Sequence, residues 1–168
     1  GTLIDPQRVF VRGAVLFDAE PFTTRTITLP SMNDWKPAKY RTLGESVMQS
    51  SIYHGPNFQC LCEWSRDGDF WFAKTHAAMP AAVRGSRQGS RWLLPSVLLD
   101  GCFQIAAVSR RLGSNFALSL PHGMSRLRWS RLPVEGEVCL IRARVIEQDE
   151  RQASFAIELA TTDGEVLL

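Results

Sequence analysis

Apolar side chains at every second position predict the strands of this chain. The clearest example is a run of alternate apolar residues at Phe58, Cys60, Cys62 and Trp64. Such spacing is typical of a strand with one apolar face. The turn residues at 65–69, which include Asp-Gly, and the aromatic residues that follow them predict a hairpin. Similar patterns predict further strands at residues 8–19, 23–29, 116–120, 125–129, 138–146 and 154–159.

Segments with weaker patterns lie between these strands. Residues 31–56 are mixed in character and are expected to pack down as a linker that contains a short helix at 38–48. Residues 78–91 are rich in Arg, Gly and Ser, which is typical of an exposed loop. Asp163-Gly164 predicts a turn just before the last residue. Because a domain rarely ends directly after a turn, we expect this sequence to be a piece of a longer domain.

One long helix is predicted at residues 96–112, with Ser96 as its N-cap and Gly113 as its stop. From Val97 to Val108 the sequence V-L-L-D-G-C-F-Q-I-A-A-V is apolar on nearly every side. Such a helix is expected to be buried all round rather than along one stripe. A sheet that curls around a single central helix provides this burial. We therefore predict an α+β hot-dog fold, in which an antiparallel sheet wraps around one long helix.

Asp100 and Gln104 are the two strongly polar residues of this apolar stretch, and their spacing of four places them on one helix face. An unpaired carboxylate is costly to bury, so an acid in the most apolar helix is a candidate for chemistry. A carboxylic acid in a dry pocket can act as a general acid, and Gln104 can orient it or hold a substrate oxygen. Gly101, which costs a helix about 1 kcal/mol relative to Ala, would let a ligand or a strand approach beside the acid. The alternative is a structural Asp that backbone donors satisfy near the helix start.

Composition and charge exclude several other classes of protein. The chain has 168 residues, 19 Lys plus Arg and 17 Asp plus Glu, so its net charge of +2 is too small to indicate nucleic-acid binding. It has no apolar run long enough for a membrane span and no visible signal peptide, so its four cysteines are expected to be reduced thiols in the cytoplasm. Cys60 and Cys62 lack a second Cys/His pair at metal-ligand spacing, so no metal is expected.

Two segments carry a resemblance to a known enzyme family. Residues 95–104 (P-S-V-L-L-D-G-C-F-Q) resemble the HPxLLDxxxQ signature of dehydratase domains in polyketide synthases and polyunsaturated fatty acid synthases. Residues 53–59 (Y-H-G-P-N-F-Q) resemble the YGPxFQ signature of the same domains. The order of the motifs and the hairpin predicted between them agree with this family. The resemblance covers residues 40–168.

The sequence departs from the family pattern at three points. Pro95 lies one residue further from the acid than usual, and the His that normally precedes this proline is absent. His54 is an additional residue between Tyr53 and Gly55. The family's catalytic His lies in an HxxxGxxxxP motif in the first of two hot-dog halves, and this chain contains no such motif.

These departures predict that the chain is the second, Asp-bearing half of a dehydratase-like domain. Residues 37–168 are expected to form that hot-dog half, and residues 1–36 to contribute strands from the end of the preceding half. The catalytic His would then come from an upstream or partner half. The histidines of this chain are predicted to be structural or surface residues; they are His54, His76 and His122.

The resemblance implies the removal of water from a β-hydroxyacyl thioester on an acyl carrier protein. The family's His takes the α-proton, whereas Asp100 would protonate the departing hydroxyl and Gln104 would position the acid or the hydroxyl. The residues expected to bind the acyl substrate are Tyr53, Gly55, Pro56, Phe58 and Gly101. No cofactor is expected, because the phosphopantetheine arm of the carrier protein holds the substrate. The expected partners are that carrier protein and the first hot-dog half of the same synthase, with a homodimer as a further option.

Two other classes of function stay open at this point. The first is a related hot-dog cyclase, double-bond isomerase or thioesterase. The second is a non-catalytic hot-dog half that serves for dimerisation or docking. Arg84, Arg87 and Arg91 could meet an acidic carrier protein, although a solvated loop is the simpler interpretation. An HxxxGxxxxP segment in the preceding sequence would favour the dehydratase.

Overall fold

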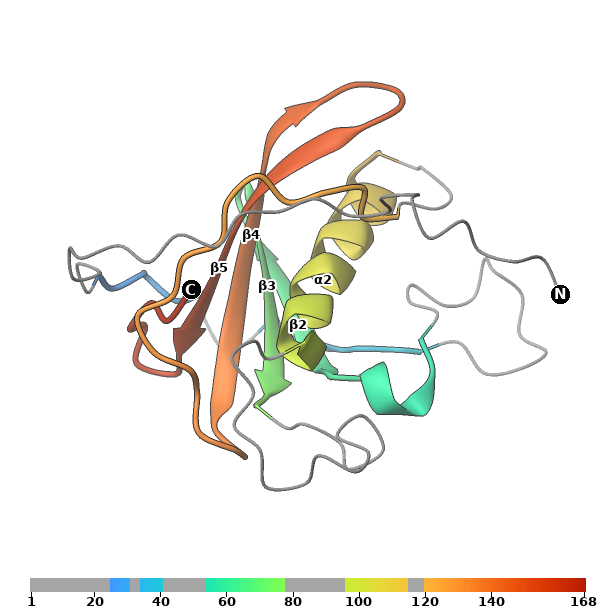
Figure 1. Ribbon diagram of the computed structural model, residues 1–168. Helices are drawn as coiled ribbons and strands as arrows, with labels where there is room; N and C mark the ends of the chain where they lie inside the picture. Colours follow the sequence, from blue (N-terminus) through green and yellow to red (C-terminus); the bar gives the residue numbers. More distant parts are fainter. Residues whose placement is uncertain (1–24, 31–33, 41–53, 78–95, 115–119) are drawn as a thin grey trace, which may run out of the picture.

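The computed structural model describes residues 25–30, 34–40, 54–77, 96–114 and 120–168. In this part of the chain, five antiparallel strands form one sheet in sequence order (Figure 1). The strands are β1 (Lys36–Pro37), β2 (Leu61–Asp67), β3 (Phe70–His76), β4 (Val138–Gln148) and β5 (Ala153–Thr161). A 3₁₀ turn, η2 (Pro56–Phe58), precedes β2, and one long helix, α2 (Ser96–Ser114), follows β3.

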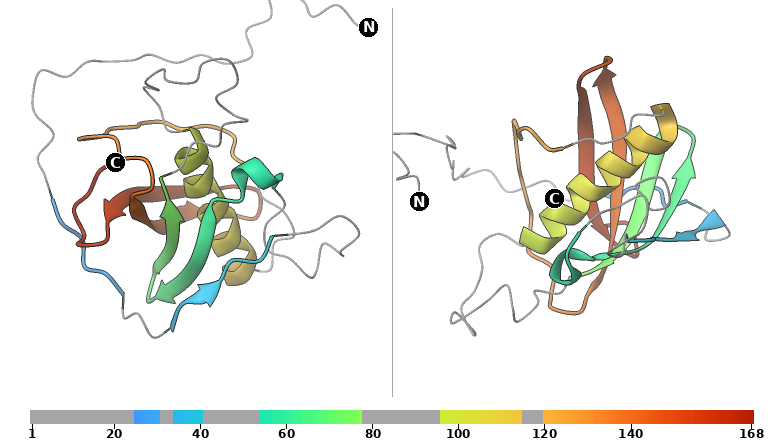
Figure 2. Two further views of the ribbon diagram at one scale, coloured as in Figure 1. Left: turned by 90° about the horizontal axis from the view of Figure 1, so that it is seen from below. Right: turned by 90° about the vertical axis from the view of Figure 1, so that its right-hand side faces the viewer.

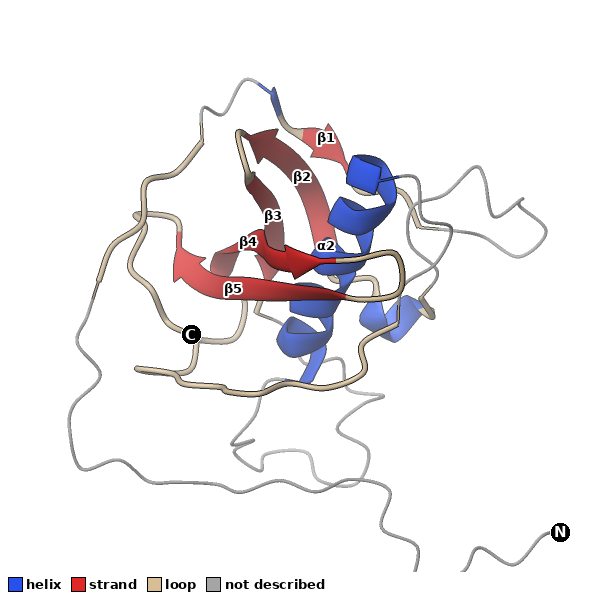
Figure 3. Cartoon of the chain, turned by 90° about the horizontal axis from the view of Figure 1, so that it is seen from above, coloured by secondary structure: helices blue, strands red, loops and turns tan. Residues whose placement is uncertain are grey.

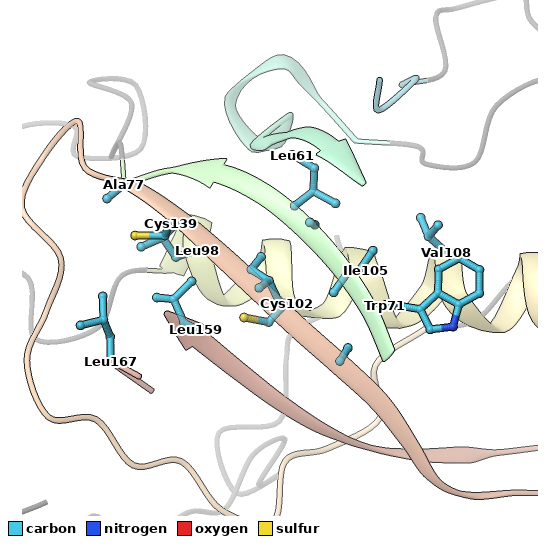
Figure 4. Packing of buried hydrophobic residues seen from close by; sticks show 13 residues of the cluster. Leu61, Trp71, Ala77, Leu98, Cys102, Ile105, Val108, Cys139, Leu159 and Leu167 are labelled. Atoms are coloured by element: carbon cyan, nitrogen blue, oxygen red, sulfur yellow. The ribbon is translucent and has the colours of Figure 1, made fainter. Parts of the chain in front are cut away.

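The sheet curves around α2, which lies across one of its faces (Figures 2 and 3). Alternate strand residues point toward the helix, because side chains on a strand alternate between its two faces. Trp71 and Ala73 of β3 belong to the same buried cluster as Ile141 and Ala143 of β4, and Ile105 of α2 lies among them without solvent exposure. Figure 4 shows this packing between the helix and the strands. The predicted α+β hot-dog fold is therefore confirmed.

The long helix is confirmed in position, and most of it is buried. It begins at Ser96 as predicted, but it continues through Gly113 to Ser114 instead of stopping at the glycine. Seven of its apolar residues have less than a tenth of their surface exposed: Val97, Leu98, Leu99, Cys102, Ile105, Ala106 and Val108. Asp100 and Phe103 are half-buried and Leu112 is exposed, so the helix is not buried all round as predicted.

The predicted hairpin is present, and β4 and β5 form a second one. Asp67 of β2 pairs with Phe70 of β3, and Gly68 makes the turn with a φ of +55°, which glycine adopts without steric cost. The β4–β5 turn is held by Asp149, whose side chain accepts hydrogen bonds from the backbone of Arg151 and Gln152. β2 begins three residues later than predicted because Pro56–Phe58 form the 3₁₀ turn.

Four predicted elements are wrong where the structure describes them. Residues 125–129 are not a strand but an exposed segment without a neighbouring strand, and Leu120 is not in a strand either. Residues 25–29 form no strand, since Thr26 makes only an isolated bridge with Glu165. Residues 38–40 are not helical, because the Ala38 amide donates to the Cys62 carbonyl and extends the pairing with β2.

Other predictions lie outside the described residues. These are the strand at 8–19, most of the helix at 38–48, the loop at 78–91 with its three arginines, and Tyr53 and Pro95. The four cysteines are free thiols, as predicted. None of the described helices combines the length and the hydropathy that a membrane span requires.

Candidate active site

The two sequence motifs meet in space through the side chain of Gln104. Its Nε2 donates a hydrogen bond to the backbone carbonyl of Phe58 over 2.7 Å, although 46 residues separate them. The local fold around η2 presents this carbonyl. Gly55 and Pro56 start the 3₁₀ turn, and the Phe58 amide donates back to the Gly55 carbonyl. Gln104 itself is 2% exposed, so it is anchored inside the molecule.

Asp100 lies one helical turn before Gln104, on the same face, as predicted. The Gln104 Nε2 also donates to the Oδ2 of Asp100 over 2.6 Å. The carboxyl group is only partly buried, with 27% of its side chain exposed. The expected dry pocket is therefore not present among the described residues, and the acid is both anchored and accessible.

Tyr40 completes the anchoring of Gln104, although no motif in the sequence pointed to it. Its hydroxyl accepts a hydrogen bond from the Leu61 amide over 2.7 Å and donates to the Gln104 Oε1 over 2.9 Å. Burial raises the pKa of Tyr40 far above its ordinary value, and the Leu61 amide opposes this shift only in part. The hydroxyl therefore keeps its proton and stays a donor.

These contacts determine which way the Gln104 amide faces. A carbonyl can only accept, so the group opposite the Phe58 oxygen must be the amide NH₂. Tyr40 already accepts from Leu61, so its own proton is available for the amide oxygen. It follows that Asp100 Oδ2 always faces an N–H donor. A donor at this position stabilises the carboxylate that forms when the acid gives up its proton.

His54 is a functional candidate that sequence reasoning missed. Its Nε2 lies 3.2 Å from Asp100 Oδ2, and 30% of its side chain is exposed. It was predicted to be structural or on the surface, because no motif assigned a role to a residue inserted before Gly55. The available signal was its position within the 53–59 motif. The other two histidines, His76 and His122, are exposed.

Gly101 lets the sheet approach the helix beside the acid. A Cβ at this position would lie 3.0 Å from the Cys60 sulfur and 3.3 Å from the Ile141 Cδ1. Cys60 in turn contacts the carbonyl of Val97 over 3.4 Å through its thiol. Burial, with the nearby Asp100 charge as a second cause, raises the pKa of Cys60 to about 12, so this thiol is a packing group and not a nucleophile.

The other described residues that were predicted to bind the acyl substrate differ in how exposed they are. Gly55 has open space where a Cβ would be, Pro56 is exposed, and Phe58 is half-buried. Their role in substrate binding stays a prediction. Among the described residues, no group of three or more His, Cys, Asp or Glu side chains could hold a metal ion.

A comparison with protein-family models places the chain in the polyketide synthase dehydratase family. Residues 34–168 match the model described as the polyketide synthase dehydratase N-terminal domain. This chain therefore belongs to that family. The matching description names an N-terminal domain, so the match does not confirm the prediction that the chain is the second, Asp-bearing half.

Solved structures similar to this chain are also dehydratase domains. The dehydratase domain of RzxB from Pseudomonas fluorescens is 17% identical over 68% of this chain, with a TM-score of 0.44. The dehydratase domain of a mycocerosic acid synthase-like polyketide synthase is 24% identical over 69% of this chain, with a TM-score of 0.43. The matches cover 40% of each of those chains, so this chain spans only part of their length. No curated protein matches the sequence.

Proposed function

We propose that this chain supplies the acid of a β-hydroxyacyl thioester dehydratase in a polyketide or fatty acid synthase. The observation that carries the proposal is the arrangement around Asp100. One oxygen of this carboxyl group is held by Gln104, which Tyr40 and the Phe58 carbonyl hold in turn. The side chain is nevertheless 27% exposed, so a substrate can reach it. The family match supports this chemistry.

The reaction requires an acid because hydroxide is a poor leaving group. A base removes the proton from Cα of the thioester, and that electron pair forms the Cα–Cβ double bond. The bond between Cβ and the hydroxyl oxygen breaks, and the hydroxyl takes the proton of Asp100 and leaves as water. Asp100 is left as a carboxylate, and the N–H of Gln104 on Oδ2 stabilises that negative charge.

The base of the reaction would come from the other hot-dog half. The sequence holds no HxxxGxxxxP motif. Asp100 and Gln104 sit in the long helix, in the segment that resembles the Asp-bearing motif of the family's second half. We therefore assign this chain to that half, with the first half as its partner. The acyl carrier protein would present the substrate on its phosphopantetheine arm, and the protein itself would need no cofactor.

Comparing this chain with a longer polypeptide tests the proposal. Each is incubated with a β-hydroxyacyl carrier protein, and the acyl product is weighed by mass spectrometry. The longer polypeptide, which carries a first hot-dog half as well, should release water. The chain alone should be slower by about 10²–10⁴-fold, which is the contribution of a general base.

Three outcomes would contradict the proposal. Equal water loss by the chain alone would show that it is not a half site. Free acid as the product would indicate a thioesterase. An unchanged acyl group with both polypeptides would favour a non-catalytic dimerisation or docking half.

A further inference from the structure

His54 contacts the acid through one specific ring nitrogen. The Nε2 lies 3.2 Å from Asp100 Oδ2. A hydrogen bond from a residue nearby in the sequence holds the backbone of the histidine. The side chain of Gln59 donates to the His54 carbonyl over 3.0 Å, so the segment closes on itself before η2. The imidazole is thus delivered to the acid by the same short segment that delivers the Phe58 carbonyl to Gln104.

The geometry does not suit His54 as the base of the reaction. Its Nε2 is directed at Asp100, and its Nδ1 is buried with no hydrogen-bond partner among the described residues. A general base must come within hydrogen-bond reach of the proton it removes. With one nitrogen engaged and the other buried, the ring has no free atom for the substrate's α-proton.

The two contacts of Asp100 with described side chains both fall on the same oxygen. Gln104 Nε2 lies 2.6 Å from Oδ2, and His54 Nε2 lies 3.2 Å from it. Oδ2 therefore accepts the N–H of Gln104 and has the His54 ring nitrogen beside it. Oδ1 is left as the oxygen that can carry the transferable proton toward the leaving hydroxyl.

We propose that His54 is a positioning residue for the acid. Its Nε2–H donates to Asp100 Oδ2, fixes the rotation of the carboxyl group together with Gln104, and directs Oδ1 at the substrate. The part of this inference that concerns turnover rests on the proposed dehydratase function, whereas the hydrogen bond does not. An unprotonated Nδ1 also fits its buried position, because orphaned N–H groups are rarer in proteins than unpaired acceptors.

The protonation of the His54 ring can be measured without any assay of activity. The chain contains three histidines, so long-range ¹H–¹⁵N spectra of the labelled protein are simple to assign with a His54→Gln variant. The proposal requires a proton on Nε2. Asp100→Ala removes the acceptor and should shift the ring toward the tautomer mixture of a free histidine. Asp100→Asn keeps an acceptor oxygen and should leave the tautomer unchanged.

The consequence for turnover is tested in the longer polypeptide with two substitutions of similar size. His54→Leu removes the donor and should lower kcat about tenfold, the effect of one hydrogen bond to a charged group, with little change in KM. His54→Gln places an amide N–H near the same position and should recover most of the lost kcat. A structural role alone would give equal losses in both variants.

The proposal is overturned by an unprotonated Nε2, by a tautomer that Asp100→Ala does not change, or by equal turnover of the Leu and Gln variants. An inactive wild-type polypeptide would instead contradict the proposed function. The tautomer measurement would in that case still decide whether His54 holds the acid.

Discussion

At the residue scale, the site depends on the direction of each hydrogen bond. The Leu61 amide donates to Tyr40, Tyr40 donates to Gln104, and Gln104 donates to both Phe58 and Asp100. In this series, each hydrogen bond determines whether the next group acts as a donor or as an acceptor. The series connects β2 and η2 to the acid on the helix, so a change at one end is expected to reach Asp100.

Removal of one hydroxyl tests this series. Tyr40→Phe leaves the Leu61 amide and the Gln104 Oε1 without their partner, which should destabilise the fold by about 1–3 kcal/mol and lower turnover. Urea unfolding of the chain measures the first effect. Ser130→Ala is the matched control, because its exposed hydroxyl also contacts backbone carbonyls and its loss should change stability by less than about 0.5 kcal/mol. Equal midpoints for the two variants would contradict the series.

The sequence predicts only part of this site. Asp100 and Gln104 could be paired in advance, because a spacing of four in a helix implies a shared face. Tyr40 and His54 could not, because their contacts with the helix cross 64 and 46 residues of chain. Such contacts depend on how the elements pack, and no periodicity in the sequence encodes them.

At the scale of elements, local sequence patterns predicted the helix and the strands that pair with the next strand in the sequence. The two hairpins and the long helix belong to this group. Residues 125–129 alternate like a strand, but no strand in the described part of the chain pairs with them, so their backbone takes another course. The two-residue strand β1 was missed because its pairing with β2 depends on Trp64 and Glu63, far along the chain.

The contact between helix and sheet at Gly101 gives a prediction for these elements. Ala is favoured over Gly in a helix by about 1 kcal/mol, but its Cβ would press on the Cys60 sulfur at 3.0 Å. Gly101→Ala should therefore be destabilising in the wild type and less so, or stabilising, in a Cys60→Ala background. A double-mutant cycle by urea unfolding should give a coupling on the order of 1 kcal/mol.

Gly55→Ala is the control for this cycle, because open space surrounds that position and its φ of −62° suits alanine. It should not destabilise the fold. Additive effects of the Gly101 and Cys60 substitutions would show that α2 does not contact Cys60 as described.

At the scale of the whole molecule, the core places free thiols where ionisation is costly. Cys102 is 4% exposed and lies between the helix and the sheet. Burial raises its pKa from 9.0 to about 12, with Cys60 and Cys139 as further causes. The native state therefore holds this proton to a higher pH than the unfolded chain does.

This difference predicts a loss of stability in alkali. Below the unfolded pKa of 9.0, the Cys102 thiol keeps its proton in both states, and its full contribution to stability is present. Above pH 9.0 the unfolded chain loses this proton first, so stability falls until the pH passes about 12. The free energy of unfolding should thus decrease between about pH 9 and about pH 12. Cys102→Ala should be less stable overall but should show a shallower decrease. An identical slope for wild type and variant would contradict the assignment.

The measurement that tests the central claim most directly compares Asp100→Asn with the wild type in the longer polypeptide. The amide keeps an oxygen for Gln104 and His54 but has no proton to transfer. Water loss from the β-hydroxyacyl carrier protein should fall by at least about 10²-fold, while the melting temperature stays unchanged or rises. Turnover that persists, or that falls only in proportion to loss of the fold, would show that Asp100 is not the acid.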